Sequence, residues 1–94
     1  MLATFTTRVE LHRAHEDDYD VLHEAMERRG FSRLITSGDG VTYHLPTAEY
    51  DYSGNTTRSQ ILQLAKSAAS ETNKKYAVLV TESRGRIWSG LQQV

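Results

Sequence analysis

Two stretches of the chain, residues 4–11 and residues 75–82, are rich in apolar and β-branched side chains. In the first stretch apolar and polar positions alternate, and this period of two predicts a strand with one buried face. The second is apolar at both sets of alternating positions, since Val78 and Val80 are separated by Leu79. It predicts a strand that carries apolar side chains on both faces of a sheet.

Two amphipathic helices are predicted between these strands. Residues 15–29 repeat apolar side chains at intervals of three and four, and Gly30 then ends the pattern. Residues 57–72 show the same spacing. Thr57 and Gln60 match a capping box, in which the hydroxyl and the amide each accept from a backbone N–H at the helix start.

The middle of the chain predicts a β-hairpin followed by a long loop. Residues 31–36 and 41–45 are strand-like, and residues 37–40, with the sequence Ser-Gly-Asp-Gly, form a strong turn signal between them. Residues 47–55 are rich in Tyr, Asp, Ser and Gly, so we expect a loop there. A loop of about nine residues is longer than most connections and is a candidate functional segment.

The order strand, helix, strand, strand, helix, strand favours an α+β fold. In a compact domain it predicts a ferredoxin-like βαββαβ two-layer sandwich, with a four-stranded antiparallel sheet and both helices on one face. Right-handed crossovers place the last strand at an edge of the sheet. We assign residues 1–83 to this domain and residues 84–94 to a C-terminal tail that carries Ile87, Trp88 and Leu91.

The last strand and the tail together predict an assembly surface. An edge strand that is apolar on both faces is unusual for a monomer, because exposed edges and apolar faces promote association. We therefore expect a homodimer that pairs through the last strand and the tail. The alternative is that the tail folds back over its own sheet.

Composition narrows the class of protein. The chain has 94 residues, enough for one domain, and no Cys, which excludes disulfides, thiolate zinc sites and a cysteine nucleophile. Its 11 Lys and Arg against 12 Asp and Glu argue against tight binding to duplex nucleic acid. We find no signal-peptide pattern and no apolar stretch of membrane-spanning length, so we expect a cytoplasmic protein with no membrane contact.

The histidines and carboxylates do not form a convergent metal motif. His12, His15 and Asp17 lie in a connection between strand and helix, where the geometry of ligands is not preset. Asp17 and Asp18 would be suited to magnesium, but a favourable contact with the helix dipole already explains their position. We expect neither a metal nor a cofactor.

Three residues are candidates for catalysis. His44 is predicted on the open side of its strand, where a neutral imidazole can act as general base on a ribose 2′-hydroxyl. Arg58 or Arg84 would stabilise the negative charge that develops on the phosphorane. The alternative is that all three are solvated surface residues.

Three further residues are candidates for RNA contact. Tyr50 and Tyr52 in the predicted loop, with an arginine nearby, have the stacking and cationic groups that proteins use to bind single-stranded RNA. Arg86 is a candidate phosphate clamp. The alternatives are that the tyrosines pack inward as anchors and that the arginine is plain solvated charge.

Three segments of the chain resemble a known family. They are residues 5–12, Phe-Thr-Thr-Arg-Val-Glu-Leu-His, together with residues 41–50 and residues 75–82. These segments look like the small bacterial proteins grouped with GhoS, the endoribonuclease antitoxin of the type V toxin–antitoxin class. The resemblance covers about residues 3–91 and is closer to other members of that group than to GhoS itself.

The resemblance implies a ferredoxin-like fold, similar to the CRISPR-adaptation nucleases, and cleavage of single-stranded mRNA that encodes a membrane toxin. Those nucleases carry an aspartate just after the first strand, where this chain has Leu11 and His12 and places Asp17 later. This difference argues against a metal-dependent mechanism. Our first hypothesis is an RNA-binding, single-strand-specific endoribonuclease antitoxin, and the alternative is a non-catalytic dimeric interaction module.

Overall fold

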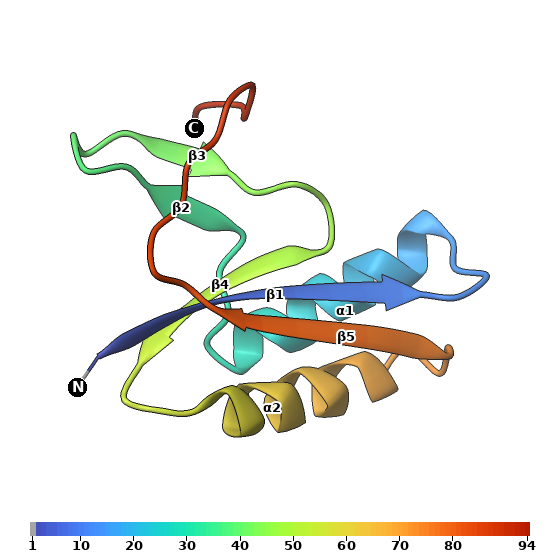
Figure 1. Cartoon of the computed structure of the whole chain (residues 1–94). Coiled ribbons are helices and arrows are strands. Elements are labelled where there is room, and N and C mark those ends of the chain that lie inside the picture. Colours follow the sequence, from blue (N-terminus) through green and yellow to red (C-terminus); the bar gives the residue numbers. More distant parts are fainter. Residues whose placement is uncertain (1) are drawn as a thin grey trace.

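The computed structural model describes residues 2–94 and contains two helices and two antiparallel sheets (Figure 1). The protein is therefore α+β, as the order of elements predicts. None of the helices in residues 2–94 has the length and apolar content that crossing a membrane requires. In chain order the elements are β1 (Ala3–Leu11), α1 (Glu16–Arg28), β2 (Leu34–Thr36), β3 (Thr42–His44), β4 (Glu49–Gly54), α2 (Arg58–Ser70) and β5 (Tyr76–Glu82).

The larger sheet, sheet A, is built around β1. This strand pairs antiparallel with β4 on one side and with β5 on the other, so the strand order is β4-β1-β5. β5 lies at an edge, and its side chains alternate between faces, both as predicted. Val78 and Val80 pack against the core, whereas Leu79 is 65% exposed on the other face.

Both helices contribute to a single core on one face of sheet A, with α1 passing behind β1 in Figure 1. The small side chains Ala65, Ala68 and Ala69 are fully buried and allow α2 to approach the sheet closely. The predicted capping box of α2 is confirmed, because Gln60 N donates to Thr57 Oγ1 at 3.2 Å and Thr57 N donates to Gln60 Oε1 at 3.1 Å. The core consists of Phe5, Val9, Leu11, Leu22, Ala25, Met26, Phe31, Tyr50, Ile61, Ala65, Ala68 and Ala69.

A separate two-stranded sheet, sheet B, stands beyond the open face of sheet A (Figure 1). It is the predicted hairpin, in which β2 and β3 pair with Ile35 opposite Tyr43. The backbone is tied to sheet A just before β2, where Ser32 and Asp51 exchange two hydrogen bonds of 2.8 and 2.7 Å. The backbone of the hairpin is thus bonded to sheet A at its base and not along its strands.

The C-terminal tail extends sheet B. His44 N donates to Gln92 O at 2.9 Å, and Val94 N donates to Thr42 O at 3.0 Å, so residues 92–94 run alongside β3. The tail does return to its own chain, but it pairs with the hairpin and not with sheet A. Sheet B therefore has backbone pairing on both sides of β3.

The tail is less apolar on its outside than the sequence suggests. Trp88 and Leu91 are half-buried against their own chain, whereas Ile87, 98% exposed, and Val94, 67% exposed, project into solvent. Of the three apolar side chains predicted for this surface, the tail therefore offers only Ile87 to a second molecule, together with Val94 at the C-terminus.

The prediction of a loop over residues 47–55 is wrong, because residues 49–54 form β4. Within this strand Tyr50 and Tyr52 alternate with Glu49 and Asp51, a period of two that the turn-forming residue types conceal. The sheet is accordingly not four-stranded as predicted. Three strands form sheet A, and the two central strands of the prediction form sheet B.

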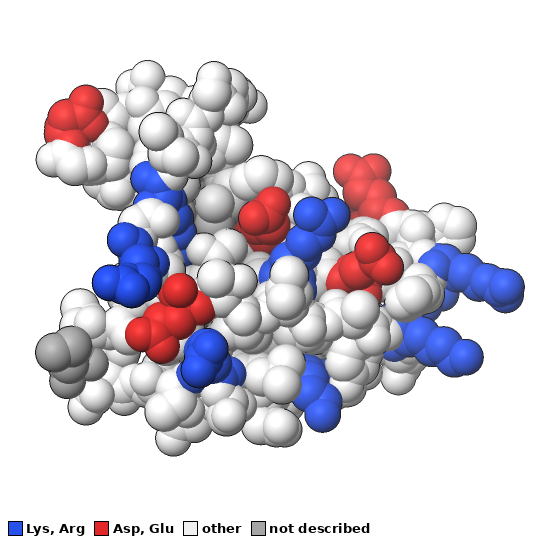
Figure 2. All heavy atoms as spheres, in the orientation of Figure 1, with Lys and Arg blue, Asp and Glu red and all other residues white. Residues whose placement is uncertain are grey.

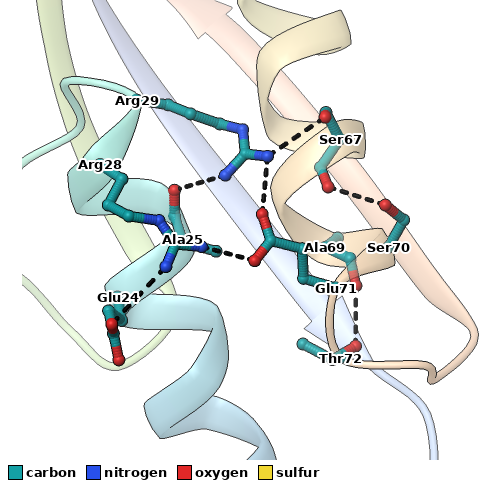
Figure 3. A network of polar contacts seen from close by, with 9 residues as sticks. All are labelled: Glu24, Ala25, Arg28, Arg29, Ser67, Ala69, Ser70, Glu71 and Thr72. Carbon is teal, nitrogen blue, oxygen red and sulfur yellow. Dashed lines mark hydrogen bonds and ion pairs between the residues drawn. The ribbon is translucent and has the colours of Figure 1, made fainter.

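An arginine clamp joins the C-terminal ends of the two helices (Figure 3). Arg29 Nη2 lies 2.7 Å from Glu71 Oε2, and Arg28 Nη2 donates to the other oxygen of the same carboxylate. Arg29 also donates to Ala25 O at 2.8 Å and to Ser67 Oγ at 3.3 Å. The hydrogen bonds, from Arg29 foremost and from Arg28, hold the pKa of Glu71 below its ordinary value.

We predict that Glu71→Gln lowers the melting temperature at neutral pH. Because the pKa of Glu71 is lower in the folded than in the unfolded chain, the carboxylate stabilises the fold above the unfolded value of 4.5. This contribution is lost as pH falls through the folded pKa. Thermal unfolding at a series of pH values should therefore show a difference between wild type and variant that shrinks in acid.

The control is Glu24→Gln, which removes the same charge but breaks only the 3.5 Å contact with Arg28. It should have a smaller effect than Glu71→Gln at neutral pH. Equal effects of the two variants would show that general charge, and not the clamp, controls the helix ends.

Candidate functional site

Tyr50, predicted to contact RNA, lies in the core and has no exposed surface. Because β4 turns its ring inward, His23 Nδ1 lies 2.6 Å from the phenol oxygen and the Phe31 ring meets it edge to face, with centroids 6.3 Å apart. A base cannot stack on a ring that is covered on all sides. The predicted RNA contact of Tyr50 is therefore corrected to a structural role.

Tyr52 is also anchored by packing. Its ring meets Phe31 edge to face, with centroids 5.2 Å apart. The ring also lies close to two glycines, since a Cβ atom would come within 3.2 Å of it at Gly30 and within 3.1 Å at Gly54. Tyr52 is half-buried and held in place, which corresponds to the anchoring alternative.

The guanidinium of Arg86 fastens the tail to the open face of sheet A. Arg86 Nε donates to Thr6 Oγ1 at 2.9 Å, and Nη2 donates to Phe5 O at 3.0 Å. The same Nη2 lies 2.8 Å from Asp51 Oδ1, as an ion pair rather than a well-aligned hydrogen bond. No acceptor within residues 2–94 is hydrogen-bonded to Nη1, so this nitrogen keeps donors for a ligand.

The three predicted catalytic residues are exposed but are not brought together. Arg58 begins α2 and Arg84 follows β5, whereas His44 lies on β3 in the other sheet. Among the described residues no hydrogen bond or ion pair joins His44 to either arginine. Tyr43 turns toward Trp88, and successive strand residues point oppositely, so His44 is directed away from Trp88.

A cleft opens where the tail crosses between the two sheets. Two adjoining hollows of about 320 Å³ each and a third of about 250 Å³ share Arg86 and Trp88 in their linings. We call these three hollows together the Trp88 cleft. The lining of one of the two 320 Å³ hollows includes Thr4, Ile35, Ser37, Ser83, Arg86 and Trp88.

Trp88 supplies an aromatic wall to this cleft. Its indole meets the Tyr43 ring edge to face, with centroids 5.4 Å apart and planes at 69°. The side chain is half-buried, so part of the ring remains open to solvent. Backbone pairing of residues 92–94 with β3 holds this segment of the tail in place.

Hydroxyl groups and one arginine give the Trp88 cleft its polar chemistry. Thr4 and Ser83 lie on the side of sheet A, and Ser37 lies on the hairpin turn. Arg84 stands between Ser83 and Gly85, two residues that line the cleft, and is itself exposed. This set of groups can bind a planar ring and an adjacent anion, but it contains no imidazole for proton transfer.

No group of three or more His, Asp or Glu side chains within residues 2–94 is placed to hold a metal ion. Asp18 instead accepts from His15 N at 2.9 Å at the beginning of α1. The acidic turn thus serves the helix terminus, which is the simpler explanation of its sequence.

The polar pair formed by His23 and Tyr50 was not anticipated from the sequence. Burial, followed by the nearby Arg33, lowers the pKa of His23, and burial raises the pKa of the Tyr50 phenol. His23 lies four residues after Tyr19 on the inward side of α1, and this spacing was the available signal. The pair is packed inside the fold and is not part of the Trp88 cleft.

We predict that Arg86→Met releases the tail without unfolding sheet A. The variant loses three polar contacts of a charged group, which should cost about 1–3 kcal/mol of unfolding free energy. Trp88 is the single tryptophan of the chain, so its emission should shift to longer wavelength as the indole becomes more exposed. Chemical denaturation and fluorescence measure the two effects.

Arg84→Met is the matched control, because it removes the same charge two residues away where the side chain is exposed. It should leave both stability and emission near wild type. Unchanged emission in Arg86→Met would mean that the tail is held by its pairing with β3 alone.

No protein-family model matches the chain, and no curated protein matches it significantly. The function proposed below therefore rests on the geometry of the Trp88 cleft and on the resemblance described for residues 3–91.

Proposed function

We propose that this protein binds single-stranded RNA in the Trp88 cleft and acts on mRNA in the cytoplasm, as the resemblance to the GhoS-like antitoxins implies. The observation that carries the proposal is the joint presence of Trp88 and Arg86 in three adjoining hollows. An unstacked base can lie on the indole while its phosphate approaches a guanidinium. Stacking of this kind contributes about 1–3 kcal/mol per base.

Two arginines supply the cationic part of the site. Arg86 is fixed by Thr6 and Phe5 and keeps Nη1 for a phosphate oxygen. Arg84 is exposed beside the cleft and can contact a phosphate of the RNA where the RNA leaves the cleft. The hydroxyls of Thr4 and Ser37 are suited to ribose and base edges, which both donate and accept hydrogen bonds.

The charge distribution favours a short single strand over duplex nucleic acid. Figure 2 shows acidic and basic side chains interspersed over this face, with no continuous band of one sign. The formal net charge is −1. Such a protein gains little from counterion release, so its affinity has to come from stacking and a few local contacts.

We propose that the fold is ferredoxin-like, with a reduced outer strand. The order β4-β1-β5 and the placement of both helices on one face support this assignment. The fourth strand of such a sheet would lie beside β4. There, Ser32 makes a single two-bond bridge to Asp51 before the chain leaves for the hairpin.

We predict that a labelled ten-nucleotide RNA binds to wild type and that Trp88→Leu weakens binding about tenfold, because one stacking platform is lost. Fluorescence anisotropy measures the affinity. Val21→Ser, on the exposed side of α1, is the control and should bind as wild type does. Equal affinity of the Trp88 variant and wild type would remove the cleft from the proposal.

Cleavage of RNA is the finer part of the proposal, with His44 as general base and Arg58 or Arg84 stabilising the phosphorane. We predict that His44→Ala lowers the cleavage rate by roughly 10²-fold, the usual scale for loss of a general base. Binding should persist, since His44 is directed away from Trp88. A metal chelator should not slow cleavage by the wild type. Cleavage by His44→Ala at the wild-type rate would exclude His44 as the general base.

A second candidate function, a dimeric interaction module, is favoured by the free edge of β5. His12 N donates to Lys75 O, and Ser83 N donates to Thr4 O, so the odd-numbered residues of β5 bond to β1. The backbone groups of the even-numbered residues therefore point outward and are open to a second strand. Leu79, 65% exposed, would be covered by such a partner.

For this candidate we predict that Leu79→Lys reduces self-association in sedimentation equilibrium at micromolar concentration. Covering a leucine contributes about 1.5–3 kcal/mol, whereas an added lysine opposes edge pairing. Val21→Lys, an exposed apolar position on α1, is the matched control. A monomeric wild type would exclude the dimer.

A further inference from the structure

A second concave region lies at the opposite end of β1 from Trp88. It has a volume of about 560 Å³ and is lined by His12, Arg13, Asn73, Lys74 and Lys75. We call it the Arg13 pocket. Figure 2 shows basic side chains projecting from this end of the molecule, where β1 ends and β5 begins.

Two turns build the Arg13 pocket and are fixed to each other. His12 N donates to Lys75 O at 2.8 Å, which joins the turn after β1 to the turn before β5. Arg13 and Asn73 both adopt left-handed backbone angles, with φ of 52° and 59°. The basic side chains are therefore presented from a defined backbone and not from a flexible terminus.

The positive charge of the pocket is only partly balanced. Lys74 Nζ lies 3.8 Å from Asp18 Oδ2, and the His12 ring lies 3.8 Å from Glu10 Oε1. No carboxylate among residues 2–94 lies within ion-pair distance of Arg13 or Lys75. An anion placed between these two side chains would therefore gain charge-assisted hydrogen bonds without displacing an existing ion pair.

We propose that the Arg13 pocket binds a phosphate group. A guanidinium offers paired donors that match the oxygens of a phosphate, and the lysine ammonium groups add point charge. Asn73 can donate from its amide, whereas an apolar ligand would find no apolar side chain in the lining. The phosphate belongs either to the backbone of RNA or to a small phosphate monoester.

This inference does not depend on the proposed RNA site. From Thr4 in the Trp88 cleft to Leu11, which directly precedes the Arg13 pocket, the strand advances by roughly 23 Å. Amide signals of Arg13 and Lys75 report on one site, and the indole N–H of Trp88 reports on the other. Failure at either site can therefore be seen separately.

The test is an NMR titration of the full chain with sodium phosphate, against sodium chloride at matched ionic strength. Saturable shifts of the Arg13, Lys74 and Lys75 amides with phosphate alone are the expected result. Shifts that are equal in chloride, or that do not saturate, would overturn the proposal.

Variants make the test specific. Arg13→Gln combined with Lys75→Gln should weaken phosphate binding by at least about tenfold, because charge-assisted hydrogen bonds are lost. Lys66→Gln, an exposed position on α2 outside the pocket, should leave affinity unchanged. Wild-type affinity in the double variant would overturn the assignment.

Adenosine monophosphate and a ten-nucleotide RNA with hydroxyl ends distinguish the two sources. Shifts with the RNA assign the site to backbone phosphates, and shifts with the nucleotide alone assign it to a phosphate monoester. Binding of neither would contradict the proposal even where inorganic phosphate binds.

Discussion

The central position of β1 is the constraint on which the rest of the structure depends. It has a paired strand on each side, and its two faces serve different purposes. Phe5 and Val9 point into the core between sheet and helices, whereas Thr4 and Thr6 point to the open face and reach the Trp88 cleft. A shift of one residue in the pairing of β1 would exchange these faces and remove both core and cleft.

Arg86 joins the tail to sheet A by polar contacts, whereas the core is held together by apolar packing. Its donors bond to a side chain and a carbonyl of β1 and contact Asp51 of β4, so one guanidinium spans two strands. Asp51 is also the residue whose backbone bridges to Ser32 before the hairpin. Asp51 thus holds sheet B over sheet A from two directions. Its backbone pairs with Ser32 just before the hairpin, and its side chain contacts Arg86 in the tail.

The elements that the sequence predicts well are those with regular apolar spacing. The first strand and both helices could be placed because their apolar side chains recur at the spacing of one buried face, and the last strand because it is an unbroken apolar, β-branched run. β4 could not, because Asp51, Ser53 and Gly54 are turn-forming types and only tertiary pairing with β1 makes them a strand. The detachment of the hairpin from sheet A depends on long-range contacts that local patterns do not contain.

The candidate site was predictable only in part, because it too depends on contacts between distant segments of the chain. Arg84 and Arg86 were recognised as cations in the right region of the chain, but the role of Trp88 as a wall of the cleft depends on where the tail returns. The sequence predicts Tyr50 in a loop and leaves RNA contact and inward packing open, and its burial follows from the alternation of β4.

The long reach of Arg86 affects the order in which the molecule folds. Its bond to Phe5 joins residues 81 positions apart, and it can form only after β5 has paired with β1, which closes nearly the same long loop. The helices and the hairpin form from much closer neighbours and can be complete before it. We therefore expect the cleft to assemble last and, in local opening of the native protein, to be released before the core of sheet A. Hydrogen exchange in residues 84–94 would then be faster than in β1, and ligand binding would slow it.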